Sequence, residues 1–155
     1  MWDFLWIDLG FNSNVSTVWT YDKGWSGYSN LLDRQEKLAE HNLSTISDIN
    51  AGEGIIIHSL TEQTLKFPKG DSYSIKDLSI VENLSIGWHL LGTNRSVSVA
   101  DIQALNSNIV SFWAYNAAEW LATADEGEFL HSIEKREISI LETIPSNSAF
   151  WVYVK

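Results

Sequence analysis

The sequence of 155 residues contains no cysteine, which excludes a disulfide framework, a cysteine-ligated zinc site and a thiol nucleophile. A chain without cysteine fits the cytoplasm, and it equally fits bacterial export into oxidising surroundings. Basic residues are few, since ten Lys and Arg oppose twenty Asp and Glu, and the formal net charge is −10. Such a chain repels phosphate backbones and anionic membrane surfaces, so we expect neither nucleic acid nor an anionic membrane as its partner.

Long hydrophobic runs are also missing. No stretch approaches the roughly 18 apolar residues that cross a bilayer, so we expect no membrane insertion. The apolar start, residues 1–8, lacks a basic segment and a small-residue cleavage site, so we do not interpret it as a signal peptide. These features, with the repeat described next, favour an internal piece of a longer protein.

Aromatic residues are abundant instead. The chain has eight Trp, five Tyr and six Phe, and hydrophobic residues make up 45% of it, which is enough for a folded core. Large rings fill cores that short strands leave open. They also form platforms that stack on sugars or peptides. The aromatic residues therefore fit either a core or a ligand-binding surface.

The aromatic residues recur in an internal repeat. Residues 14–22, NVSTVWTYD, return as residues 108–116, NIVSFWAYN. After one inserted residue, a constant offset of 95 pairs Trp25 with Trp120 and continues to the end of each half. Few residues are identical, but the apolar and aromatic spacing persists. The sequence therefore predicts two diverged copies of one module, copy one at 1–65 and copy two at 84–155, joined by a linker at 66–83.

Copy two opens with a predicted strand, residues 84–93, that has no counterpart in copy one. A sheet without its first strand exposes an unpaired edge. We therefore expect that edge to be covered by upstream residues, by the other copy or by a neighbouring chain, which makes a homo-oligomer plausible.

Local patterns predict the elements within each copy. Alternation and turn residues predict hairpins at 15–21 with 25–28 and at 109–115 with 120–123, and a second hairpin at 45–49 with 54–60. Helical spacing predicts short helices at 96–105, at 31–42 and, as the equivalent of the first, at 2–9. The expected fold is mainly β with short helices (α+β), in which two diverged copies of a small β-sheet module pack as a pseudo-symmetric unit.

Three motifs carry a family resemblance: GWHLLGT at 87–93, the Trp-x-Tyr strands and INAGEG at 49–54. Together they resemble aromatic-rich repeat modules that occur in tandem in large exported or surface proteins of Gram-negative bacteria. The resemblance implies an extracellular or cell-surface location and a role in adhesion or surface architecture. It carries no catalytic residue, because that family has no settled biochemical activity.

The chain departs from that family pattern in complementary ways. Copy one keeps the glycine turn but has isoleucines at 55–57 in place of the closing aromatic residues. Copy two keeps the aromatic run FWV at 150–152 but has PSNSA at 145–149 in place of the glycines. His89 stands where the family usually has asparagine.

Motifs for catalysis or metal binding are missing. The sequence has no Gly-x-Ser-x-Gly elbow, no phosphate loop and no dinucleotide fingerprint. Its four histidines are scattered, and the acidic run at 125–128 does not meet the EF-hand pattern. We therefore predict no catalytic residue, no metal site and no cofactor.

Aromatic residues next to the hairpin turns are the candidate ligand-binding residues. We expect exposed rings to stack on a sugar while polar neighbours bond its hydroxyls, with these residues as the set: Trp25, Tyr28, Trp120, Asp22, Asn116 and Glu119. Rings within strands are predicted to form the structural core: Trp19, Tyr21, Trp88, Trp113, Tyr115 and Trp151.

Three functions follow as hypotheses. The first is a non-catalytic structural or adhesive module of a larger exported or cell-surface bacterial protein. The second is a carbohydrate-binding module that uses exposed aromatic rings, with a glycan or another surface protein as partner. The third is a small hydrolase, which requires a histidine within hydrogen-bond reach of an aspartate or serine in a deep polar pocket.

Overall fold

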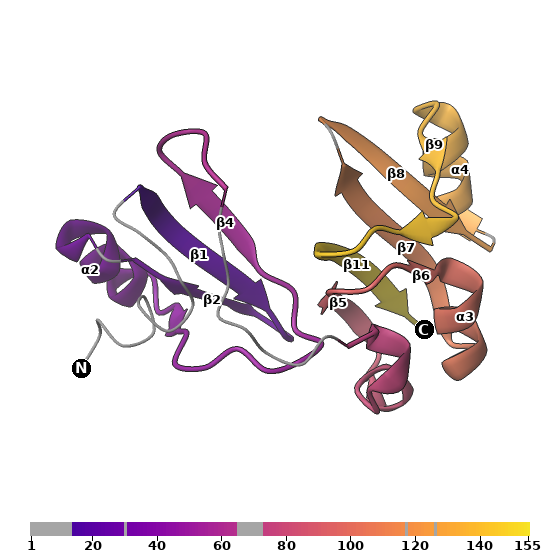
Figure 1. Ribbon diagram of the computed structural model, residues 1–155, viewed down its shortest axis with the longest axis horizontal. Coiled ribbons are helices and arrows are strands. Elements are labelled where there is room, and N and C mark those ends of the chain that lie inside the picture. The colour runs from indigo at the N-terminus through magenta and orange to yellow at the C-terminus, as the bar shows by residue number, and fades with distance from the viewer. Residues whose placement is uncertain (1–13, 30, 65–72, 117, 126) are drawn as a thin grey trace. The chain divides into compact units, whose positions relative to one another are not determined.

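Alternating apolar residues and tight turns form the strands of this chain, and the computed structural model describes residues 14–29, 31–64, 73–116, 118–125 and 127–155. Within these residues the protein is a mainly β α+β fold with three short α-helices and three sheets. The chain divides into two compact units (Figure 1). Of the described residues, unit 1 contains 14–50 and 55–64, and unit 2 contains 51–54 and 73–155.

Unit 1 is built around the first predicted hairpin. Strands β1 (Val15–Tyr21) and β2 (Trp25–Tyr28) pair antiparallel, as the turn residues between them predict. Helix α2 (Leu32–Glu40) follows, and the chain returns as β3 (Ser44–Thr45) and β4 (Ile56–Ser59). The strand order is β3-β2-β1-β4. The prediction of a second hairpin at 45–49 with 54–60 is wrong, because β3 pairs in parallel with β2 and β4 pairs with β1.

Unit 2 has the larger sheet, in the order β5-β11-β7-β8-β9. Its strands are β5 (Gly87–Thr93), β7 (Ile109–Asn116), β8 (Glu119–Ala124), β9 (Ser139–Ile140) and β11 (Ser148–Val154). A two-stranded sheet joins β6 (Val97–Ser98) to β10 (Thr143–Ile144). The helices are α3 (Val99–Leu105) and α4 (Gly127–Lys135), with 3₁₀ turns η1 (Ile75–Asp77) and η2 (Val81–Asn83).

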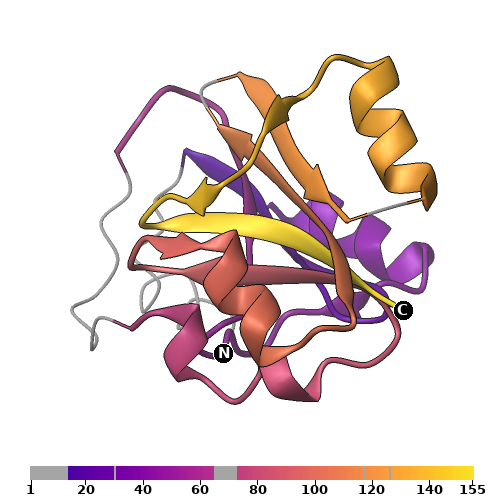
Figure 2. The ribbon, with the colours of Figure 1, turned by 90° about the vertical axis from the view of Figure 1, so that its right-hand side faces the viewer.

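Helix α3 lies across one face of the unit 2 sheet (Figure 2). It begins at Val99, three residues after the predicted start, because the Ser98 hydroxyl accepts a hydrogen bond from the Asp101 amide at 3.0 Å and caps the first turn. Its buried Val99 and Ile102 belong to one apolar cluster with Phe112 of β7 and with β11. Burial of this face is the main stabilising contribution in unit 2.

The predicted linker contributes to this same cluster. Ile75 and Val81, both within 66–83, are fully buried in unit 2. The linker prediction is therefore corrected for 73–83, because these residues supply apolar side chains to the core. Its first part, 66–72, and the predicted helix at 2–9 both lie outside the described residues.

The two sheets share strand order and register. Without β5, the order in unit 2 matches that in unit 1, with β9, β8, β7 and β11 in place of β3, β2, β1 and β4. The parallel pair Ser26–Ser44 corresponds at an offset of 95 to the pair Leu121–Ser139. The Gly27 carbonyl accepts from the Ile46 amide at 3.1 Å, and the Ala122 carbonyl accepts from the Leu141 amide at 3.0 Å.

A β-bulge recurs at the matching position of both sheets. The register of β1 with β4 shifts between Val15 and Thr17, and that of β7 with β11 shifts between Tyr153 and Val154. The extra residue places Val15 on the buried face with Val18, whereas Thr17 and Trp19 point to the other face. Simple alternation, which places Val15 with Trp19, is therefore corrected by the bulge.

Candidate functional site

Each hairpin carries a tyrosine and a tryptophan directly opposite each other. Tyr21 pairs with Trp25 in unit 1, and Tyr115 pairs with Trp120 in unit 2. The ring centroids lie 5.3 Å apart at 74° in the first pair and 5.4 Å apart at 62° in the second. Both are edge-to-face contacts of favourable geometry. We call these the Tyr–Trp pairs.

The Tyr–Trp pairs lie at the surface of their units. Trp25 is 41% exposed and Trp120 is 47% exposed, as the prediction of ligand-binding rings requires. Tyr115 is 61% exposed, so its assignment to the structural core is corrected. Since Tyr115 stands opposite Trp120, the two side chains share the open face of the sheet.

Tyr28 is the other correction to the candidate site. Its side chain is 3% exposed and belongs to the small buried cluster of unit 1 with Val15, Val18 and Ile46. Side chains alternate along β2, so Tyr28 points to the face opposite that of Trp25. The structure therefore does not bring Tyr28 to the Tyr–Trp pair.

The polar candidates are exposed at the hairpin ends. Asp22 follows β1, and Asn116 stands opposite Glu119 at the end of the β7–β8 ladder. All three side chains are exposed, but side chains alternate along β7 and β8, so Asn116 and Glu119 point to the face opposite that of Tyr115 and Trp120. They supply carbonyl, amide and carboxylate groups that bond hydroxyls.

The remaining rings predicted as core are half-buried and lie outside the two buried clusters: Trp19, Tyr21, Trp88, Trp113 and Trp151. The two faces of each sheet explain this. In unit 2, Phe150 and Val152 point into the core, so Trp151 and Tyr153, which alternate with them, point to the opposite face.

Unit 2 gathers an aromatic cluster on that opposite face. Trp88 of β5 contacts Tyr153 at 5.2 Å, Trp151 at 6.3 Å and Phe129 of α4 at 5.4 Å between ring centroids. Helix α4 thus covers part of this face, while the Tyr–Trp pair lies beside it on β7 and β8.

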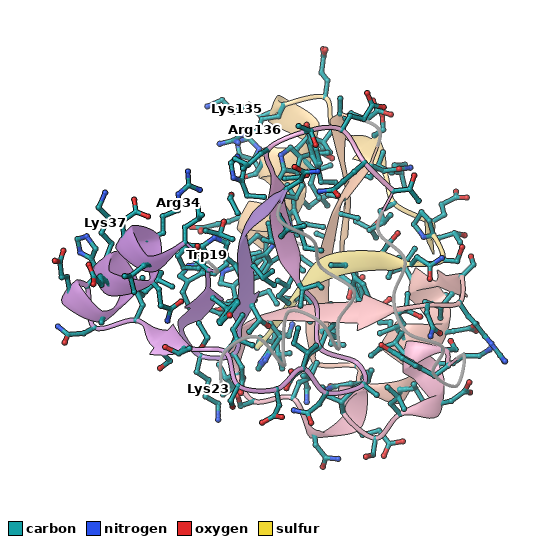
Figure 3. All side chains as sticks on the ribbon, turned by 60° about the vertical axis from the view of Figure 1, so that its left-hand side comes forward. Trp19, Lys23, Arg34, Lys37, Lys135 and Arg136 are labelled. Carbon is teal, nitrogen blue, oxygen red and sulfur yellow. The ribbon has the colours of Figure 1, made fainter. Side chains whose placement is uncertain are left out.

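Unit 1 has an open apolar hollow on its corresponding face. It has a volume of about 410 Å³ and is lined by Trp19, Trp25, Leu43 and Ile56. Trp19, labelled in Figure 3, packs over Gly27, where an added Cβ would lie 2.8 Å from the indole ring. Ile56 stands where unit 2 has Trp151, and Gly27 where it has Ala122, so smaller side chains line the hollow.

One serine–histidine contact bears on the hydrolase hypothesis. The Ser16 hydroxyl lies 2.5 Å from His58 Nδ1 and 3.2 Å from the His58 carbonyl. Ser16 is the extra residue of the bulge and is fully buried. A buried hydroxyl is not accessible to a substrate, and the contact joins β1 to β4.

Within the described part of the chain, no helix is long and apolar enough to cross a membrane. The same residues contain no group of three or more His, Asp or Glu side chains arranged to hold a metal ion.

No protein-family model, no curated protein sequence and no solved structure matches this chain. The likeness to tandem surface modules therefore stays a prediction from the three sequence motifs. The geometry of the two units is what bears on function.

Proposed function

We propose that this chain is a non-catalytic module pair, two diverged copies of one β module, that serves a structural or adhesive role in a larger exported or cell-surface protein. The observation that carries the proposal is the recurrence of one strand order, register, bulge and Tyr–Trp pair in the two units. Duplicated modules that present the same exposed rings suit multivalent attachment, because linked weak sites raise overall avidity.

The proposal is tested with the purified full chain coated on beads and offered to whole bacterial cells and to immobilised surface proteins. We expect retention that falls when Trp25→Ala and Trp120→Ala are combined and falls less with either change alone. Ile140→Ala is the matched control, since Ile140 is also exposed and apolar but has no aromatic ring. Equal retention by the double variant and by the control contradicts the proposal.

Carbohydrate binding is the second candidate, and the unit 2 Tyr–Trp pair favours it. Two exposed rings, Tyr115 and Trp120, lie edge to face near the hairpin end and offer an apolar surface on which a sugar ring can stack. Affinity electrophoresis in polysaccharide gels tests it. Retardation that Trp120→Ala weakens about tenfold, or about 1.4 kcal/mol, supports a glycan site. Unchanged mobility on every polysaccharide favours the adhesive role alone.

A hydrolase is the less favoured candidate. Its best serine–histidine pair, Ser16 with His58, has its hydroxyl buried inside a bulge. A nucleophile must reach the carbonyl carbon it attacks. Turnover of a chromogenic ester that disappears with Ser16→Ala, in a variant that keeps its fold, is the result that favours this candidate.

A further inference from the structure

The edges of the sheets differ in how they are protected. An exposed edge strand offers unpaired N–H and C=O groups to any other strand, and proteins blunt such edges by shortening, covering or charging them. Edge strands β3 and β9 are each two residues long. Both are therefore too short to template a further strand.

The outer edge of β5 is covered. The Gly54 amide donates to the Leu90 carbonyl at 3.0 Å, and the Gly92 amide donates to the Gly52 carbonyl at 2.9 Å. Glycine is required for this approach, because a Cβ at Gly54 would lie 2.5 Å from the Leu91 carbonyl oxygen. Residues 51–54 therefore close that edge within unit 2.

Strand β4 has none of these protections. It is four residues long, Ile56–Ser59, and contains neither lysine nor proline. One side pairs with β1, and among the described residues no backbone hydrogen bond reaches its other side. Ile56 is 40% exposed at this edge, and Leu60, which follows the last residue of β4, is exposed too.

Unit 2 shows what occupies the corresponding edge. There β11 corresponds to β4, and β5 pairs antiparallel along its full length. In that ladder Gly87, Trp88, His89 and Leu90 stand opposite Val154, Tyr153, Val152 and Trp151. At the offset of 95, the four β4 residues from Ser59 back to Ile56 take the places of these partners.

We infer that the outer edge of β4 is a strand-docking site that takes an antiparallel strand of the β5 type, Gly-Trp-x-Leu-Leu-Gly, from a separate module. Main-chain hydrogen bonds supply the affinity in such strand addition, and alternate side chains supply the specificity. The docking site does not depend on what the Tyr–Trp pairs bind.

Side chains around β4 suit the indole of such a strand. In unit 2 the Trp88 ring contacts Phe129, Trp151 and Tyr153, and the corresponding positions in unit 1 are Arg34, Ile56 and His58. Figure 3 shows Arg34 and Lys37 on α2. An arginine plane stacks on an indole, and an aliphatic side chain packs against it. The docked strand itself carries no charge that the acidic chain would repel.

The test uses the full chain, labelled with ¹⁵N, and a synthetic peptide with the sequence of residues 84–94, LSIGWHLLGTN. Titration is followed by amide chemical shifts and by hydrogen exchange at each amide. We expect saturable shifts at residues 56–59 and slower exchange at Ile57 and Ser59, whose amides face the open edge because that of Leu60 faces β1. A peptide with proline at the position of His89 is the matched control, because the Leu90 carbonyl faces Gly54, so the amide of the neighbouring His89 faces β11, and proline cannot donate to that ladder. It should bind at least tenfold more weakly.

A substitution in the protein distinguishes binding at the β4 edge from nonspecific binding of the peptide. Ile56→Lys places a charge at the open edge and is expected to weaken binding about tenfold, whereas Ile140→Lys, on the exposed part of β9, leaves it unchanged. Three outcomes overturn the inference: equal binding of the proline peptide, shifts at β11 instead of β4, or a concentration-dependent dimer that protects β4 without peptide.

Discussion

Units 1 and 2 share a strand order and register and differ in the side chains on those strands. Where unit 2 surrounds Trp88 with Phe129, Trp151 and Tyr153, unit 1 has Arg34, Ile56 and His58 and, among its described residues, no strand in the position of β5. The strand and the rings that pack against its tryptophan differ together. Strand register and bulge position are therefore the same in both units although these side chains differ. The outer edge of the sheet differs with them, because β5 pairs with β11 in unit 2 while β4 is the edge strand among the described residues of unit 1.

The largest expected difference between the units is in the free energy of unfolding that is lost when one core side chain is truncated to alanine. Phe150→Ala in unit 2 should lower the free energy of unfolding by about 3–5 kcal/mol, because the side chain is fully buried. Ile55→Ala at the matching position of unit 1 should cost less than about 2 kcal/mol, since Ile55 is only partly buried. Urea unfolding followed by circular dichroism measures both, and equal costs would break the comparison.

A glycine–alanine exchange tests how each tryptophan lies on its sheet. Gly27→Ala brings a Cβ to within 2.8 Å of the Trp19 ring and should cost about 1–3 kcal/mol, with a changed near-ultraviolet circular dichroism signal. Ala122→Gly in unit 2 should cost about 0.5–1 kcal/mol through backbone flexibility. If Gly27→Ala stabilises the protein, the packing of Trp19 on Gly27 is wrong.

Double-mutant cycles sharpen the likeness between the Tyr–Trp pairs. Tyr21→Leu with Trp25→Leu, and Tyr115→Leu with Trp120→Leu, should each give a coupling of about 0.5–1.5 kcal/mol, because the two ring geometries match. Thermal unfolding of the single and double variants provides the values. A coupling in one unit and none in the other would show that the pairs are not equivalent.

The smallest effect concerns one hydrogen bond. In unit 1 the Trp19 indole donates to the Thr17 hydroxyl at 3.2 Å, whereas the Ser111 hydroxyl and the Trp113 indole N–H in unit 2 are buried without partners among the described residues. Thr17→Val should therefore cost about 0.5 kcal/mol, and Ser111→Ala should be neutral or stabilising. A destabilising Ser111→Ala would indicate a partner for that hydroxyl, and urea midpoints decide.

Local signals in the sequence were sufficient for two of the three predicted hairpins, for α2 and for α3. Alternation around short turns predicts β1 with β2 and β7 with β8, and helical spacing predicts α3, which Ser98 caps. The pairing of β4 with β1 and the parallel pairing of β3 with β2 join strands that are not consecutive hairpin partners, so no turn motif in the sequence predicts them. The Pro and Gly residues of 66–83 predict a linker, although Ile75 and Val81 of this segment pack in the core.

The candidate site was predicted in part. Trp25 and Trp120 are exposed as expected, but their partners Tyr21 and Tyr115 were assigned to the core. The turn at 22–24 already places Tyr21 opposite Trp25, so cross-strand pairing was the signal that could have found both pairs. Closeness to the turn predicts an exposed Tyr28, whereas alternation along β2 places it on the buried face, where it lies.

Residue-resolved hydrogen exchange on the full chain tests the central claim most directly. Matching amides of β1 and β7 should be similarly protected, every amide of β11 should exchange slowly because β5 and β7 flank it, and alternate amides of β4 should exchange rapidly. Uniform slow exchange along β4 in the isolated chain, or unlike protection in β1 and β7, would contradict one shared plan with an open edge in unit 1.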